Sequence, residues 1–431
     1  MKRHCSTVDP RIRKALRVEE RFNFLQLPTD LVLYCLKFAV SDEKDALAAS
    51  RSCRFVKQII YQTPGLFSVP VLVTPALAKV HPFWTSLACD DLSSTIDSLR
   101  LFRSTLDTLY ISKEPIGCYA SHLVEVGRFP PLRFLTIDSE CNNVALALAL
   151  HLGFHGLASL CIPHVEICSY IASALPVTLQ VLKADCISRA GAESLRVLPE
   201  LETLELYLCC EYPFILCDKF PSLKSYVISR FTNEILEQSI ASDLNQRQVL
   251  DFTPFQCLEH LTVDDHARLK LPQSLKNLET YQSNLLIGEI PKLEYLAMEV
   301  AMVHNSNSEL PLHLAQLNQL CSLPSLERLS VEIIAPNTWQ QVASLPKLRF
   351  LQLWHTDNPL HFYPITAIQS LEHLLIYSSS VSHFVVHHLL RALAGIKTVT
   401  LFSCPNVNVT ELRACYPHVF VKKKESMCSC A

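Results

Sequence analysis

The chain has 431 residues, of which 49% are apolar and only 18% are charged, and its formal net charge at pH 7 is −3. A composition this apolar excludes a disordered chain. The net charge is close to neutral, whereas a nucleic-acid-binding protein usually carries an excess of basic residues. The 8 glycines do not fall in the spacing of a phosphate-binding loop or of a hydrolase nucleophile elbow. We therefore expect no nucleic-acid partner, no cofactor and no enzymatic activity.

The 18 cysteines indicate the compartment. They stand singly in apolar surroundings without a C-x-x-C pair, which is typical of reduced cysteines buried as small apolar side chains. Examples are Cys35, Cys53, Cys89, Cys161, Cys257 and Cys321. The N-terminus lacks the apolar core of a signal peptide, and the longest apolar run, Val144 to Leu150, is far shorter than the ~20 residues that span a bilayer. We expect a cytoplasmic or nuclear protein, or both.

Residues 22–68 follow a basic N-terminus, residues 1–21, which we expect to be flexible. Pro28 suits the first turn of a helix, and Leu33 and Leu36 follow it at helical spacing. A second helix start and a third apolar helical stretch come later in this segment. The segment is therefore predicted to form three short helices.

The same residues carry a motif pattern. It consists of the opening Leu27-Pro28-Thr-Asp30-Leu31, the run Cys53-Arg54-Phe55 and the closing Pro64-Gly-Leu-Phe67. This pattern resembles an F-box over residues 24–68, with Ser52 standing where that family usually has valine. The alternative is an ordinary helical cap on the first unit of a repeat array.

The F-box resemblance implies a partner. In that family the three helices dock the Skp adaptor of a Skp–cullin–F-box ubiquitin ligase, and through it a cullin and a RING protein. The adaptor-binding residues implied here are Leu27, Pro28, Leu31, Leu33, Leu36, Leu47, Cys53 and Val56.

Residues 105–413 repeat one pattern, apolar-x-x-apolar-x-apolar, thirteen times at intervals of about 24 residues. The copies begin at Leu106, Leu132, Leu157, Leu179, Leu201, Leu223, Leu258, Leu275, Leu293, Leu326, Leu348, Leu371 and Ile396. The last two apolar residues of each copy point to one face of a strand, and units this short must stack to bury them. Proline often precedes the motif, as at Pro221 and Pro324.

This repeat resembles the leucine-rich repeat. It predicts an α/β solenoid, a horseshoe of about 13 repeats behind the F-box, with residues 69–104 as linker and N-terminal cap and residues 414–431 as a C-terminal tail. The copies at Leu258, Leu275 and Leu293 lie only 17 and 18 residues apart, which predicts returns with almost no helix. A longer interval contains the helix-like stretch 233–250.

The residues that flank the last apolar position of each copy should line the inner surface of the horseshoe. These two columns hold seven acids and one base, Lys183. In the last three repeats, one column presents three aromatic rings, which stacked strands about 4.8 Å apart would join into a shelf. The predicted target-binding residues are Asp264, Glu299, Glu332, Trp354, Tyr377 and Phe402. We expect a protein target with Lys or Arg beside an apolar or aromatic residue, unless the C-terminal tail covers the rings.

Two weaker patterns remain. His383, His387 and His388 lie at helical spacing, but without a convergent carboxylate or cysteine they predict a surface helix and no metal site. Cys428 begins a C-terminal tetrapeptide that fits a lipidation motif loosely, so membrane attachment is expected only if the C-terminal cysteines are lipidated. The sequence as a whole predicts a non-catalytic substrate receptor; the alternative is a leucine-rich-repeat binding or inhibitor protein with no ubiquitin role.

Overall fold

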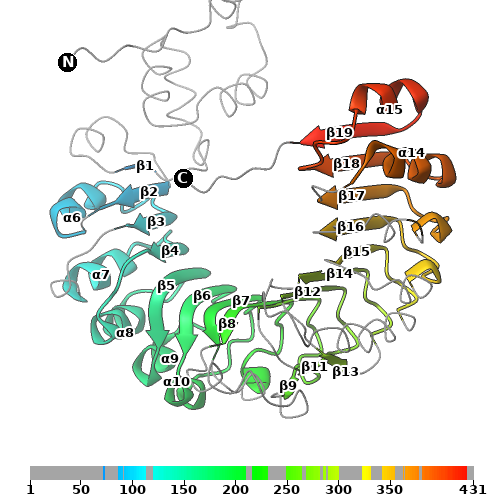
Figure 1. Cartoon of the computed structure of the whole chain (residues 1–431). Helices are drawn as coiled ribbons and strands as arrows, with labels where there is room; N and C mark the ends of the chain where they lie inside the picture. Colours follow the sequence, from blue (N-terminus) through cyan, green and yellow to red (C-terminus); the bar gives the residue numbers. More distant parts are fainter. Residues whose placement is uncertain are drawn as a thin grey trace, which may run out of the picture. The chain divides into compact units, whose positions relative to one another are not determined.

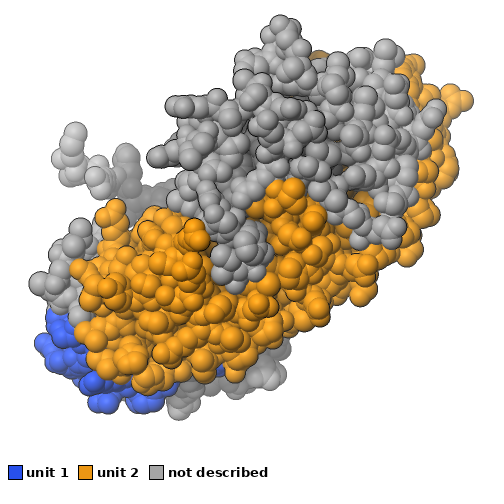
Figure 2. All heavy atoms as spheres, turned by 90° about the horizontal axis from the view of Figure 1, so that it is seen from below, with its two compact units in different colours: residues 1–136 blue, residues 137–431 orange. Residues whose placement is uncertain are grey.

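The computed structural model describes residues 71–72, 86–90, 92–112, 120–209, 216–231, 249–264, 268–281, 285–287, 290–299, 323–331, 342–354, 363, 365–377 and 381–424. The F-box-like segment 22–68 and Cys428 lie outside these residues. The chain divides into two compact units, Met1–Thr136 and Ile137–Ala431 (Figure 2).

The first unit contains parallel strands in the order β1-β2-β3-β4. Its described elements are β1 (Val71–Leu72), β2 (Ser86–Cys89), α6 (Leu92–Arg100), β3 (Thr108–Ile111), α7 (Ala120–Gly127) and β4 (Phe134–Ile137), which runs up to the boundary. Regular strands and a helix therefore already begin within 69–104, the segment predicted as linker and cap.

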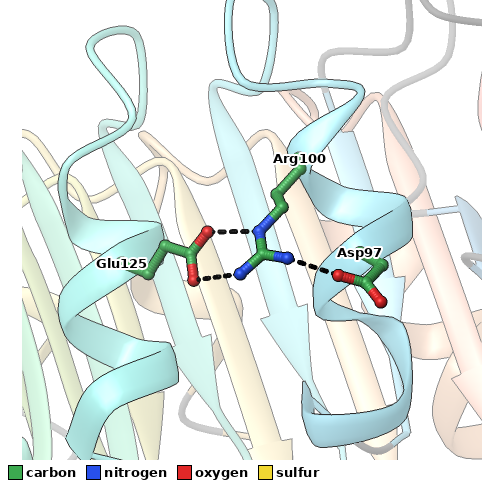
Figure 3. Close-up of polar contacts among 3 residues, drawn as sticks. All are labelled: Asp97, Arg100 and Glu125. Carbon is green, nitrogen blue, oxygen red and sulfur yellow. Dashed lines mark hydrogen bonds and ion pairs between the residues drawn. The ribbon is translucent and has the colours of Figure 1, made fainter.

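An ion pair joins the two described helices of the first unit (Figure 3). Arg100, in the last turn of α6, donates two parallel hydrogen bonds to the carboxylate of Glu125 on α7, and Nη2 lies 2.9 Å from Oε2. The same guanidinium pairs with Asp97 one turn earlier. These hydrogen bonds hold the pKa of Glu125 below its usual value. The helices of neighbouring repeats are thus held in register by a bidentate contact.

The second unit repeats one parallel strand after another, in the order β5-β6-β7-β8-β10-β12-β14-β15-β16-β17-β18-β19. Its strands are β5 (Ser159–Ile167), β6 (Val181–Ile187), β7 (Thr203–Cys209), β8 (Ser225–Phe231), β10 (His260–Asp264), β12 (Asn277–Tyr281), β14 (Tyr295–Glu299), β15 (Arg328–Val331), β16 (Phe350–Trp354), β17 (His373–Tyr377), β18 (Thr398–Phe402) and β19 (Phe420–Lys424). Its described helices are α8 (Asn143–Leu152), α9 (Ser169–Ala174), α10 (Arg189–Ser194), the 3₁₀ turn η2 (Cys217–Lys219), α14 (His383–Ala392) and α15 (Val409–Cys415). Within this unit, the sheet lies on the inner side of a curve and the helices lie on the outer side (Figure 1).

The first residue of each predicted copy begins the core. All thirteen are buried, with no more than 4% of their surface exposed. In most copies, the backbone N–H of this residue donates to the carbonyl three residues earlier, as from Leu223 to Phe220 and from Leu326 to Leu323. Pro221 and Pro324 stand second in these turns, where proline's fixed φ is already correct. Each turn delivers a leucine into the core just before its strand.

Most strands alternate between core and surface. In β17 and β18 the second and fourth residues are buried and the others are partly exposed. The register places the buried apolar residues of neighbouring strands beside each other. Leu351 of β16, for example, pairs with Leu329 of β15 on one side and with Leu374 of β17 on the other. One apolar column thus continues from repeat to repeat, and the second unit is an α/β solenoid of stacked repeats.

The predicted returns without helix are confirmed. The two repeats with short spacing return through the extended segments β11 (Arg268–Lys270) and β13 (Leu285–Ile287). These form a second parallel sheet with β9 (Val249–Asp251), which lies in the preceding long interval, in the order β13-β11-β9. Seventeen or eighteen residues leave no room for a helix beside the strand and its turns. Of the predicted helix-like stretch 233–250, only Val249 and Leu250 are described, and both lie in β9.

The strand ladder extends beyond the predicted end of the repeats at residue 413. β19 pairs in parallel with β18, and Val421 occupies the core column with no exposed surface. The repeat pattern misses this strand because two of its three apolar positions hold His418 and Lys423. The Nζ of Lys423 instead lies 3.4 Å from the carbonyl oxygens of Pro405 and Val407.

A ladder of opposite charges accompanies the turns of neighbouring repeats. Its ion pairs are Glu202–Lys224 (2.6 Å), Glu259–Lys276 (3.0 Å) and Glu372–Lys397 (2.8 Å). The hydrogen bond from Lys397 holds the pKa of Glu372 below its usual value. Exposed pairs of this kind contribute little energy individually, so the apolar columns carry the stability of the ladder.

Thr280 of β12 interrupts the apolar core column. Its side chain is 1% exposed, and within the described part of the chain its hydroxyl has no hydrogen-bond partner. Because a buried hydroxyl without a partner costs free energy, Thr280→Val should raise the free energy of unfolding by about 1 kcal/mol, measured by urea denaturation. Thr262→Val, on the exposed face of β10, is the control and should change the midpoint little; equal effects of both would contradict this account.

The cysteines correct one expectation. Cys89 and Cys404 are buried, as predicted from their apolar surroundings, whereas Cys161 is partly exposed and Cys257 is exposed. Cys257 stands third in the turn that ends at Leu258, a position that faces solvent. In the described part of the chain, no helix is both long enough and apolar enough to cross a bilayer.

Candidate protein-binding face

The side chains opposite the core in β14–β19 form the concave surface that we call the C-terminal face. Strand register arranges them in three columns. The first column is Tyr295, Arg328, Phe350, His373, Thr398 and Phe420; the middle column is Ala297, Ser330, Gln352, Leu375, Thr400 and Lys422; the last column includes Trp354, Tyr377, Phe402 and Lys424. Most of these side chains are partly or fully exposed where described.

The predicted aromatic column is confirmed in its register. Trp354 pairs with Tyr377, and Tyr377 pairs with Phe402. The Tyr377 and Phe402 rings stack with centroids 4.1 Å apart and planes within 9°. Partial burial raises the pKa of the Tyr377 hydroxyl, although both rings keep exposed surface. Only the backbone of Trp354 is described, so the third ring of the shelf remains a prediction.

Lys424 lies next to this stack on β19. Its backbone pairs with Phe402, and its Nζ lies 5.1 Å from the centre of the Phe402 ring. The alternative that C-terminal residues cover the rings therefore applies in part: β19 lies beside Phe402 and places one ammonium over it. The residue beside the aromatic shelf on this side is therefore a lysine. The two columns predicted from the sequence end before β19 and do not include it.

The first column was missed entirely by the sequence analysis. Arg328 of β15 lies between two rings, with its guanidinium carbon 5.3 Å from the centre of Tyr295 and 5.0 Å from that of Phe350. His373 continues the row, 6.4 Å from Phe350. The signal was available, because the third residue of each repeat pattern has the same strand parity as the two columns considered. Arginine held between aromatic planes is a frequent binding anchor.

The structure describes part of the acidic column. Asp264 of β10 and Glu299 of β14 pair through their backbones with Tyr281 of β12, so they belong to one column as predicted. Nothing is described of their side chains, and Glu332 lies outside the described residues. The adaptor-binding residues of segment 22–68 lie outside them as well.

Two concave acids of the earlier repeats are paired within the sheet. Glu205 of β7 forms an ion pair with Lys183 of β6. The hydrogen bond between them raises the pKa of Lys183. Asp138 lies 3.1 Å from the Nε2 atom of His164. Asp185 and Glu279, by contrast, form no ion pair with any residue described. The net acidity of the concave surface is therefore weaker than the count of acids predicts.

The three histidines of α14 pack against neighbours. His387 meets the ring of Tyr416 at 5.2 Å, His388 meets Tyr363 at 5.1 Å, and His383 lies 3.5 Å from a carboxylate oxygen of Glu411. Among the residues that the structure describes, no three or more side chains lie together as a group that could hold a metal ion. These histidines serve packing and capping of the last repeats.

Comparisons with known proteins give fold likeness alone. No protein-family model and no curated protein matches the sequence. Similar solved structures include a leucine-rich-repeat protein of Leptospira interrogans, 15% identical, with a TM-score of 0.39 over 81% of this chain and 92% of that one. Another is the TLR13–ssRNA13 complex, 14% identical, with a TM-score of 0.44 over 84% of this chain and 63% of that one. The present chain thus spans under two thirds of the second structure, and its fold assignment rests on its own strand ladder.

Proposed function

We propose that this chain is a non-catalytic receptor that holds a protein target on the concave side of its repeats. The observation that carries the proposal is the C-terminal face, where the stacked rings of Tyr377 and Phe402 and the guanidinium of Arg328 lie on the surface of a rigid sheet. Aromatic residues and arginine are the usual anchors of protein interfaces. A parallel ladder fixes their spacing before any target arrives, which lowers the entropic cost of binding.

The ubiquitin-ligase part of the proposal rests on the F-box resemblance of residues 24–68. In this reading the segment docks the Skp adaptor, and the receptor contributes proximity between a target lysine and a charged conjugating enzyme. No side chain of the receptor would take part in the transfer. Such a protein would act in the cytoplasm, the nucleus or both.

Capture of the adaptor by the full-length chain tests this function. Wild-type protein should retain the Skp adaptor and its cullin from a cell extract, and Leu27→Ala combined with Pro28→Ala should reduce the retained adaptor by at least about tenfold, because apolar anchors dominate such interfaces. The matched control removes two exposed leucines of α8, Leu148→Ala with Leu152→Ala, and should retain the adaptor. Wild-type protein that captures no adaptor would favour a repeat-based binding or inhibitor protein without a ubiquitin role.

A further inference from the structure

The charges of the concave surface of the second unit are separated along the ladder. At the C-terminal face, Arg328, Lys422 and Lys424 project from the exposed side of the sheet. Within the described part of the chain, no carboxylate forms an ion pair with any of these three. Earlier in the ladder, Asp185 of β6 and Glu279 of β12 face the same side and also form no ion pair with a described residue.

This separation is a property of the concave side. At three of the turns, opposite charges of neighbouring repeats pair with each other, as in Glu372–Lys397. Among the concave charges without a described ion-pair partner, by contrast, the acids lie on β6 and β12 and the bases lie on β15 and β19. The sheet pairs Glu205 and Asp138 internally and leaves these other concave charges for another molecule.

The aromatic shelf lies beside the basic end. Tyr377 and Phe402 stack two strands and one strand before β19, and Lys424 lies over the Phe402 ring. A ligand residue on this stack would thus have a lysine next to it. An acidic side chain of the ligand, adjacent to an aromatic or apolar one, fits these neighbours by charge and by contact.

We infer that the concave surface binds an extended protein segment with separated charges: a basic part over β6–β12 and an acidic part over β15–β19. Within the acidic part, an aromatic or apolar residue on the Tyr377–Phe402 stack lies between acidic residues at Arg328 on one side and at Lys422 and Lys424 on the other. This inference rests on the proposed function, because it specifies the target that the receptor holds. It changes the expected target from one with a base beside the aromatic residue to one with an acid there.

The ladder also sets the length of that segment. Six strand-to-strand steps separate β12 from β19, or about 29 Å at a spacing of about 4.8 Å. An extended chain advances about 3.3 Å per residue. The basic and acidic groups of the target should therefore lie roughly nine residues apart, or somewhat fewer on the inner side of the curve.

Synthetic peptides test the inference by fluorescence anisotropy with the full-length protein. The probe peptide carries lysines at one end and a phenylalanine between glutamates at the other end, in both chain directions; the reference peptide has the same residues with its charges alternating. The charge-separated peptide in one direction should bind about tenfold more tightly than the alternating one. Equal affinity, no binding of either peptide, or preference for a single-stranded RNA probe would overturn the inference.

Variants locate the basic end. Lys422→Glu with Lys424→Glu should weaken binding of the charge-separated peptide by about tenfold or more. The matched control, Lys347→Glu with Arg391→Glu, makes the same charge change at exposed positions on a turn and on α14, and should bind within about twofold of wild type. Arg328→Gln, on a different strand, guards against misfolding of β19 and should also weaken binding.

Adaptor capture separates this inference from the proposed function. Both charge-changed proteins should retain the Skp adaptor as well as wild type does. If the adaptor is retained and the double lysine variant binds the peptide normally, the inference fails while the proposed function stands. If the peptides behave as expected and no adaptor is captured, the repeats bind such targets outside a ubiquitin ligase.

Discussion

Gly191→Ala is expected to lower the free energy of unfolding by about 3 kcal/mol, the upper part of the range for overpacked interiors. Gly191 lies in the first turn of α10, where its N–H donates to the Oγ of the capping residue Ser188. A Cβ at this position would overlap the carbonyl oxygen of Ile167 at the end of β5. Backbone meets backbone here, so no change of rotamer relieves the overlap.

Urea denaturation of the full chain checks this expectation, with Gly156→Ala as the matched control. A Cβ on Gly156 would meet nothing within 4 Å, so its substitution should be neutral or stabilise slightly by restricting the unfolded chain. Equal midpoints for the two variants would show that the close approach of α10 to β5 does not constrain the fold.

Leu351→Ala is the second substitution with a large expected effect, a loss of 2–5 kcal/mol that reflects lost burial and the cavity left behind. Leu351 has no exposed surface and stands in the apolar column between Leu329 and Leu374. Each repeat contacts its neighbours alone, so the cavity interrupts the column on both sides.

The matched control for Leu351 is its neighbour Gln352, which faces the opposite side of β16 and is partly exposed. Gln352→Ala should change the urea midpoint little. A loss at Gln352 as large as that at Leu351 would contradict the assignment of core and concave faces. That assignment underlies every column described above.

Much of the fold follows from one sequence pattern. The first residue of the pattern is buried in all thirteen copies, because a strand too short to bury its own apolar edge must stack. The short spacing between Leu258, Leu275 and Leu293 likewise predicts the extended returns β11 and β13. These features depend only on the local spacing of apolar residues, so they can be predicted from the sequence.

The candidate face is less completely encoded. The sequence pattern misses β19 because His418 and Lys423 occupy positions that are apolar in the other repeats. The ammonium group of Lys423 donates instead to the backbone carbonyls of Pro405 and Val407. This last strand brings Lys422 and Lys424 to the concave surface. The stacking of Arg328 between two rings depends on side-chain conformations in separate repeats, which no pattern within one repeat specifies.

The exposure of Cys257 has a related cause. Its apolar surroundings predict burial, but the turn that ends at Leu258 directs its third residue outward. The same turn recurs before most strands, so solvent exposure at this position follows from the repeat and not from the neighbouring residue types. The position within the turn is therefore a better predictor than local hydrophobicity.

Direct titration of the purified full-length chain with purified Skp adaptor tests the receptor account most closely. We predict a saturable complex for wild type and for Lys422→Glu with Lys424→Glu, and no measurable complex for Leu27→Ala with Pro28→Ala when that protein keeps the wild-type urea midpoint. Absence of a complex with the wild-type chain, or equal affinity of the wild-type and Leu27→Ala with Pro28→Ala chains, would contradict the account.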